Sequence, residues 1–159
     1  MSKFKLDEID HQILDMLIEN TRTPFTDIAK KLLISAGTVH VRVKKMEDLG
    51  IIKGSSLTLD YKMLGYNFIA YVGVLIDRSR RTYEIIEELK KKPYVTVAHI
   101  TTGKYNIFCK IRAKGTEHAR EIIFSIDDVE GVLRTETMIS LEESINDKKR
   151  LMKNIFQEL

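Results

Sequence analysis

The chain has 159 residues, 43% of them hydrophobic, which is enough apolar material for one sizeable core or two small ones. No apolar run reaches the roughly 20 residues needed to cross a bilayer, and the N-terminus lacks the apolar core of a signal peptide, so we expect a cytoplasmic protein with no membrane partner. The single cysteine, Cys109, excludes an internal disulfide, and a net charge of only +3 means that any nucleic-acid partner must be held by a local basic patch.

Apolar residues recur at helical spacing through the first fifty residues. A first helix begins after Asp7, a good N-cap, and a second follows Thr23, which we expect to cap it. A third helix begins after the capping residue Ser35 and ends before Gly50. Three short amphipathic helices, with about two residues between the second and third, predict a helix-turn-helix domain over residues 1–50.

The third helix has a polar face opposite its apolar stripe. Small and polar residues near its start permit close approach to base edges, and its basic residues can approach phosphates. The predicted DNA-binding residues lie on this face or just beyond the helix: Ser35, Gly37, Thr38, His40, Val41, Arg42, Lys44, Lys45 and Lys53. The alternative is a three-helix packing module whose charged face is only solvated.

Residues 51–65 are predicted to form a hairpin linker. The short apolar runs 51–54 and 57–59 resemble the two strands of a small wing, which would complete a winged helix-turn-helix. Lys53 would then lie near a phosphate.

Strands and helices alternate over residues 66–159, which predicts a second domain. We expect strands at 66–77, 94–102, 105–113 and 132–142 and helices at 81–92 and 117–126. The order βαββαβ is that of a ferredoxin-like sandwich, so the predicted fold class is α+β. The tail, 143–159, is predicted to be a polar helix with one apolar side.

The first strand of this domain is apolar on both faces. One face carries Phe68, Ala70, Val72, Val74 and Ile76, and the other carries Ile69, Tyr71, Gly73 and Leu75. The two helices of a βαββαβ motif cover only one of these faces. An uncovered apolar face of this size predicts a homodimer, and two helix-turn-helix units suit a two-fold related DNA site. The alternative is that the C-terminal helix covers this face within one chain.

Segments throughout the chain resemble the Lrp/AsnC (feast/famine) family of transcriptional regulators. They are residues 6–10 (LDEID), 20–22 (NTR), 27–29 (DIA), 35–46 (SAGTVHVRVKKM), 50–52 (GII), 64–66 (LGY), 101–108 (TTGKYNIF) and 134–137 (RTET). Residues 35–46 and 101–108 are especially similar to the asparagine-sensing branch. The resemblance implies a sequence-specific DNA-binding regulator that forms dimers and octamers and binds a small amino acid, asparagine in the first instance, between dimers.

The resemblance also implies where the effector binds. The expected contacts are Thr101, Thr102, Gly103, Tyr105, Asn106, Thr135, Glu136 and Thr137. Backbone N–H groups at the Gly103 turn would hold the effector carboxylate, and Glu136 would pair with its ammonium group. The alternatives are that Gly103 only permits a tight hairpin and that residues 135–137 are ordinary strand residues.

Two positions depart from the family pattern. Leu33 stands in the turn where members often carry glycine, and a positive φ there would cost leucine ~1 kcal/mol or more. Asn106 stands where many members carry aspartate, and an amide supplies no charge to an effector ammonium.

Other classes of protein fit the sequence less well. The four histidines share no metal-binding spacing, and there is no nucleophile, P-loop or dinucleotide motif, so neither a metal site nor an enzyme is expected. Three alternatives are a ligand-independent chromosome-organising DNA-binding protein, a stand-alone amino-acid-binding module, and a small ferredoxin-like enzyme.

Overall fold

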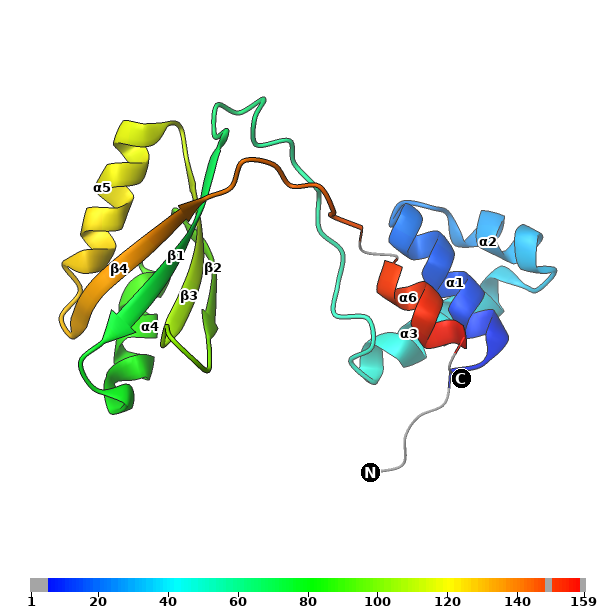
Figure 1. Cartoon of the computed structure of the whole chain (residues 1–159). Coiled ribbons are helices and arrows are strands. Elements are labelled where there is room, and N and C mark those ends of the chain that lie inside the picture. Colours follow the sequence, from blue (N-terminus) through cyan, green and yellow to red (C-terminus); the bar gives the residue numbers. More distant parts are fainter. Residues whose placement is uncertain (1–5, 148–149, 158–159) are drawn as a thin grey trace. The chain divides into compact units, whose positions relative to one another are not determined.

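A computed structural model describes residues 6–147 and 150–157, and the chain forms two compact units (Figure 1). The first unit comprises Met1–Thr58 and Ile145–Leu159, and the second comprises Leu59–Ser144. Each unit has its own apolar core. Within the described ranges, no helix has both the length and the apolar content of a membrane span.

The first unit contains the helix-turn-helix and the C-terminal helix: α1 Glu8–Glu19, α2 Phe25–Leu32, α3 Ala36–Asp48 and α6 Arg150–Gln157. The apolar faces of α1, α2 and α3 meet in a core of Ile13, Leu14, Ile28, Ala29, Val39, Val43 and Met46. Met152 of α6 packs against this core. The predicted tail helix is therefore present over part of its range, but it belongs to the first unit and not to the sheet.

Local hydrogen bonds explain where the helices begin. Asp7 caps α1 and forms a capping box with Asp10, and the Ser35 hydroxyl accepts a hydrogen bond from the N–H group three residues later at the start of α3. The prediction that Thr23 caps α2 is wrong, because its hydroxyl donates to a carbonyl of the preceding turn. Pro24 occupies the cap position instead and makes no side-chain cap bond.

The turn between α2 and α3 contains a leucine in the left-handed conformation. Leu33 has φ 56° and ψ 39°, is 92% exposed, and is the only non-glycine residue with positive φ in the described part of the chain. The turn geometry is thus the one that glycine usually provides. In this conformation the Cβ of Leu33 lies too close to the following carbonyl oxygen, which strains the backbone. Because the side chain is exposed, no burial of apolar surface offsets this strain.

Leu33→Gly is therefore expected to raise the free energy of unfolding by about 0.5–1 kcal/mol, because glycine adopts the left-handed region without strain. Leu33→Ala is the matched control, since it removes the exposed side chain but keeps the Cβ. Urea denaturation of the three proteins measures the difference. Equal stability of the glycine and alanine variants would contradict the assignment of strain to this turn.

The predicted wing does not form. Residues 51–60 contain no strand, and residues 61–65 form a turn. A two-stranded hairpin is marginal without a packed apolar face, and here Leu57 is 73% and Leu59 49% exposed. The helix-turn-helix prediction is confirmed without its wing, and the hairpin linker is replaced by an irregular segment.

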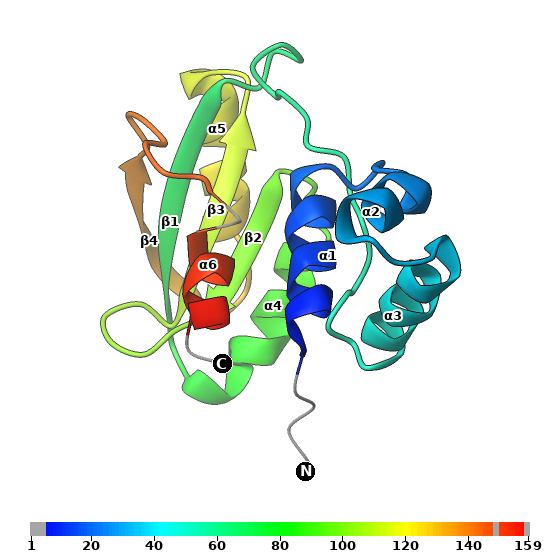
Figure 2. The same cartoon turned by 90° about the vertical axis from the view of Figure 1, so that its right-hand side faces the viewer.

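The second unit is a four-stranded antiparallel sheet with two helices on one face. Its elements are β1 Phe68–Ile76, the 3-10 helix η1 Ser79–Arg81, α4 Thr82–Lys90, β2 Val95–Ile100, β3 Ile107–Ala113, α5 Thr116–Asp127 and β4 Val132–Ile139. The strand order is β2-β3-β1-β4, and both helices lie behind the strands in Figure 2. The βαββαβ prediction is confirmed.

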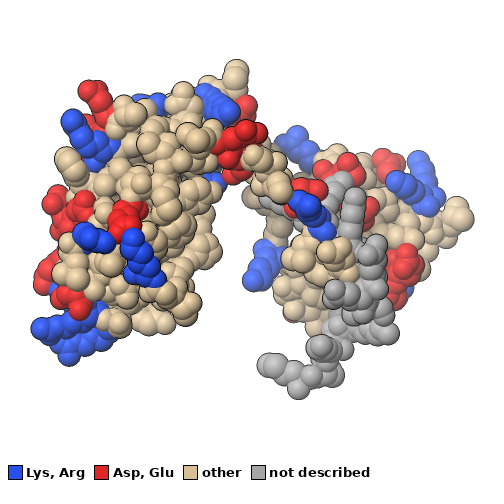
Figure 3. Space-filling view, viewed as in Figure 1, with Lys and Arg blue, Asp and Glu red and all other residues tan. Residues whose placement is uncertain are grey.

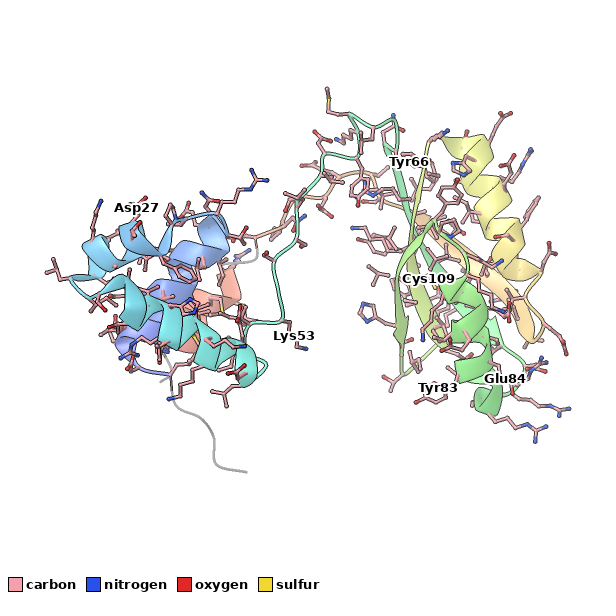
Figure 4. The ribbon with its side chains drawn as sticks, turned by 180° about the vertical axis from the view of Figure 1, so that it is seen from behind. Asp27, Lys53, Tyr66, Tyr83, Glu84 and Cys109 are labelled. Carbon is pink, nitrogen blue, oxygen red and sulfur yellow. The ribbon has the colours of Figure 1, made fainter. Side chains whose placement is uncertain are left out.

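The core of this unit lies between the sheet and its helices. Alternate residues of β1 and β3 point into it, and the largest fully buried side chains from all elements are Val72, Val74, Ile85, Leu89, Ile107, Cys109, Ile111 and Ile126. Cys109 lies within this layer in Figure 4. Burial raises the pKa of its thiol to about 11, as expected of a packed cysteine rather than a reactive one.

The opposite side of the sheet, here called the open face, carries no helix of this unit. It consists of Ile69, Tyr71, Gly73 and Leu75 of β1 with their cross-strand neighbours Phe108, Lys110, Arg112, Arg134, Glu136 and Met138. The Tyr71 and Phe108 rings stack, with centroids 5.9 Å apart and an interplanar angle of 14°. The centre of the face is apolar as predicted, while β3 and β4 add charged residues that β1 alone did not indicate. Figure 3 shows acidic and basic side chains interspersed over the visible surface of this unit.

Candidate DNA-binding helix and effector site

The outward face of α3 is formed by the residues that lie between the buried ones along the helix. Val39, Val43 and Met46 are buried, which turns most of the predicted DNA-binding residues to solvent. Those exposed are Ser35, Gly37, Thr38, His40, Val41, Lys44 and Lys45. An open hollow of about 450 Å³ runs along this face, lined by His40, Val41, Lys44, Lys45, Asp48 and Leu49.

The start of α3 is polar and capped by side-chain hydrogen bonds. The Ser35 hydroxyl accepts from the Thr38 N–H at 3.0 Å, and the two hydroxyl oxygens lie 2.8 Å apart. The His40 ring lies 6.0 Å from the Phe25 ring of α2. A Cβ on Gly37 would meet only the Ser35 hydroxyl at an ordinary 3.7 Å, so packing within the chain does not require glycine there.

The basic residues of this region differ in their surroundings. Lys44 pairs with Asp48 at 2.8 Å, and this hydrogen bond raises the pKa of its ammonium group, but both side chains are well exposed. Lys53 is exposed in the segment after α3, as Figure 4 shows. Such exposed ammonium groups can exchange a side-chain partner for a phosphate at little cost.

Arg42 is the exception. Its Nη1 donates to Asp7 at 2.7 Å and to Asp10 at 2.8 Å, and the hydrogen bond to Asp10 is the largest cause of its raised pKa. This contact could not be predicted from sequence spacing, because it joins residues more than 30 positions apart. The only feature of this contact that is visible locally in the sequence is the capping-box spacing of Asp7 and Asp10.

The predicted effector turn is tied to the end of β1. The Thr101 hydroxyl donates to the Tyr105 carbonyl at 2.8 Å, and the Asn106 N–H donates to the Val74 carbonyl at 3.0 Å. Asn106 Oδ1 accepts from the Ile76 N–H at 3.1 Å, which leaves the amide nitrogen as the side chain's donor. Thr102 and Gly103 are exposed at the tip of the turn, where Gly103 has φ 100°.

Glu136 lies at the centre of a charged cluster on the open face. Its carboxylate accepts from the Tyr105 hydroxyl at 2.7 Å and pairs with Lys104 and Arg134. The hydrogen bond from Lys104 is the largest of the causes that lower the pKa of Glu136. An effector ammonium group would have to compete with these two cations. Neither cation is among the predicted effector residues.

The eight predicted effector residues do not share one surface. Thr135 and Thr137 pair with Val74 and Val72, so they face the helix side of the sheet. Glu136 points the other way, toward Tyr105. Successive residues of a strand point to opposite faces, so residues 135–137 could not all face one site, although they are contiguous in sequence.

Comparison with known proteins identifies both units. Residues 6–47 match the AsnC-type helix-turn-helix domain, and residues 69–149 match the Lrp/AsnC ligand binding domain. The chain belongs to the Lrp/AsnC family. This family consists of transcriptional regulators and not of enzymes, so the first unit of this Lrp/AsnC regulator contains its DNA-binding domain and the second its ligand-binding domain.

Individual relatives extend this similarity over nearly the whole chain. The regulatory protein AsnC of Haemophilus influenzae is 33% identical over 141 residues, covering 88% of this chain and 94% of the relative. AsnC of Escherichia coli K12 is 32% identical over 146 residues, covering 91% and 96%. The solved structure of Escherichia coli AsnC matches with a TM-score of 0.87 at 31% identity, covering 91% of this chain and 97% of that chain.

Proposed function

We propose that this Lrp/AsnC regulator binds double-stranded DNA sequence-specifically through the outward face of α3, and that an amino acid modulates its activity or assembly in the cytoplasm, where chromosomal DNA is. The observation that supports the DNA-binding part is the capped, exposed and polar start of α3. Ser35, Gly37, Thr38, His40 and Val41 are proposed to approach base edges, and Lys44, Lys45 and Lys53 to contact phosphates.

Lys44→Ala tests the phosphate contacts. It is expected to weaken binding to all DNA sequences and to reduce the slope of log affinity against log salt by about 0.9, the value of one lost phosphate contact. Fluorescence anisotropy between 50 and 200 mM salt measures the slope. Lys90→Ala is the matched control, because Lys90 on α4 is also exposed and also pairs with an acid on its own helix.

An unchanged slope for Lys44→Ala would contradict the proposed face. The wild-type protein separates two candidate functions in the same experiment. Selection of particular duplexes from a random pool supports a sequence-specific regulator, whereas salt-dependent binding without sequence preference supports a chromosome-organising protein.

The open face supports assembly into a homodimer. Ile69, Tyr71, Leu75 and Phe108 are only partly buried within one chain, and Met138 is 43% exposed. The same face of a second copy can pack against it about a two-fold axis, so that the apolar centres are buried against each other and the charged residues lie at the margins. Assembly of dimers into an octamer is proposed from the family resemblance, with the effector between dimers.

Asparagine is the first effector to test, because relatives covering most of the chain are named AsnC. The proposed site combines the turn from Thr101 to Asn106 with Glu136 and its neighbours, while Thr135 and Thr137 would contribute only through the opposite side of β4. An effector acts by binding two states of the protein unequally. Isothermal titration with asparagine and with the other common amino acids tests the proposal, and no heat and no shift in melting temperature with any of them would exclude it.

A further inference from the structure

The Arg42 guanidinium is held by both carboxylates at the start of α1. Nη1 lies 2.7 Å from Asp7 Oδ2 and 2.8 Å from Asp10 Oδ1. The Arg42 side chain is 26% exposed and that of Asp10 is 8% exposed. This contact therefore differs from the exposed ion pairs of the chain, which contribute little to stability.

The capping box holds the two carboxylates through hydrogen bonds that do not involve Arg42. Asp7 Oδ1 accepts from the Asp10 N–H at 2.9 Å, and Asp10 Oδ2 accepts from the Asp7 N–H at 3.2 Å. The remaining oxygen of each carboxylate is the one that binds Arg42. All four oxygens have a partner, so the start of α1 presents a rigid acceptor to one side of α3.

A phosphate contact by Arg42 would require this arrangement to break. The guanidinium would have to leave two carboxylates, and Asp10 would remain largely buried with its charge uncompensated, which is costly. One cation between two carboxylates also gives the cluster a local charge of −1, which does not attract phosphate.

Arg42 lies beside the proposed base-reading residues. Thr38 is four positions earlier, about one helical turn, and Val41 is adjacent in sequence. A small rotation of α3 about its axis would displace both side chains relative to a DNA groove. Apolar contacts of the buried stripe are not directional and tolerate a small rotation. A charge-assisted hydrogen bond depends on geometry and therefore opposes the rotation more strongly.

We propose that Arg42 is a positioning residue for DNA recognition. Together with Asp7 and Asp10 it fixes the rotation of α3 against α1, and it makes no phosphate contact of its own. Its removal lowers the discrimination between DNA sequences and leaves the electrostatic part of binding unchanged.

The test uses the full-length protein, Arg42→Gln and Asp10→Asn singly and together, and Lys44→Ala as the phosphate-contact control. Affinities are measured for a duplex selected from a random pool and for a scrambled duplex, at a temperature where circular dichroism shows every variant folded. Each single variant is expected to reduce the ratio of the two affinities by about fivefold or more, the value of one base-pair contact. The double variant is expected to lose no more than either single one, because both remove the same contact.

The salt slope on scrambled DNA distinguishes the remaining possibilities. It is expected to stay unchanged in Arg42→Gln and to fall in Lys44→Ala. A fall of about 0.9 in Arg42→Gln would make Arg42 a phosphate contact and overturn the proposal. A lower melting temperature with an unchanged affinity ratio would overturn it as well, since the residue would then serve stability alone.

Arg42→Lys keeps the proposal testable if Arg42→Gln does not fold. Lysine keeps the charge but lacks the rigid planar group whose Nη1 donates to both carboxylates. A reduced affinity ratio with an unchanged salt slope supports positioning. An affinity ratio equal to that of the wild-type protein shows that charge alone suffices and contradicts the directional role.

Discussion

Tyr71→Glu combined with Phe108→Glu is expected to leave the protein monomeric at micromolar concentration. The two rings stack at the centre of the open face, on the two middle strands of the sheet. In the proposed dimer each subunit would have to bury two carboxylates against an apolar surface, and burial of unpaired charge is strongly unfavourable. Dimer affinity should fall by about 100-fold or more, as for other central aromatic residues of interfaces.

Analytical ultracentrifugation over the micromolar range measures this change. Tyr83→Glu is the matched control, because Tyr83 is 74% exposed on α4, on the helix side of the same unit (Figure 4). The control is expected to sediment like the wild-type protein. A wild-type protein that is itself monomeric, or a double variant that stays dimeric, would show that the open face does not mediate assembly.

Gly73→Ala is expected to destabilise the protein by about 1–3 kcal/mol, the usual cost of overpacking. A Cβ at this position would lie 2.6 Å from the Tyr105 ring, and the ring carbons cannot move without the whole side chain. Displacement of the ring would also break the hydrogen bond from the Tyr105 hydroxyl to Glu136. Gly73 thus allows an aromatic residue of the predicted effector turn to lie on the sheet.

A double-mutant cycle with Tyr105→Ala isolates this contact. Once the ring is removed, Gly73→Ala is expected to be neutral or to stabilise by up to about 1 kcal/mol, because alanine restricts the unfolded chain more than glycine does. Urea denaturation of the four proteins gives the free energies of unfolding. An equal cost of Gly73→Ala in both backgrounds would show that Tyr105 does not occupy the space above Gly73.

Local patterns predicted the elements and the caps that depend on neighbouring residues. Asp7 and Ser35 act within one helical turn, so their roles follow from sequence spacing alone. The left-handed turn at Leu33 was predictable only through the family resemblance, because leucine is not itself a signal for that conformation. Strand alternation likewise predicted the apolar half of the open face.

Features that depend on tertiary placement were not predictable. Arg42 was expected to reach phosphate because its charge is visible in the sequence, whereas the two carboxylates that bind it come from another helix. Lys104 reaches Glu136 only once β3 and β4 lie on either side of β1, whereas Arg134 lies two residues from Glu136 on the same strand, a spacing that is visible in the sequence. The prediction of a wing was wrong for a related reason, because a short two-stranded hairpin is stable only when other elements pack against it.

The position of α6 makes the first unit discontinuous along the polypeptide. Its three N-terminal helices are complete by Asp48, but Met152, which packs against their core, is synthesised only after the entire sheet unit. The second unit is thus an insertion within the first. During translation the three N-terminal helices are therefore complete before the sheet unit is made, and the contact of Met152 with their core can form only afterwards.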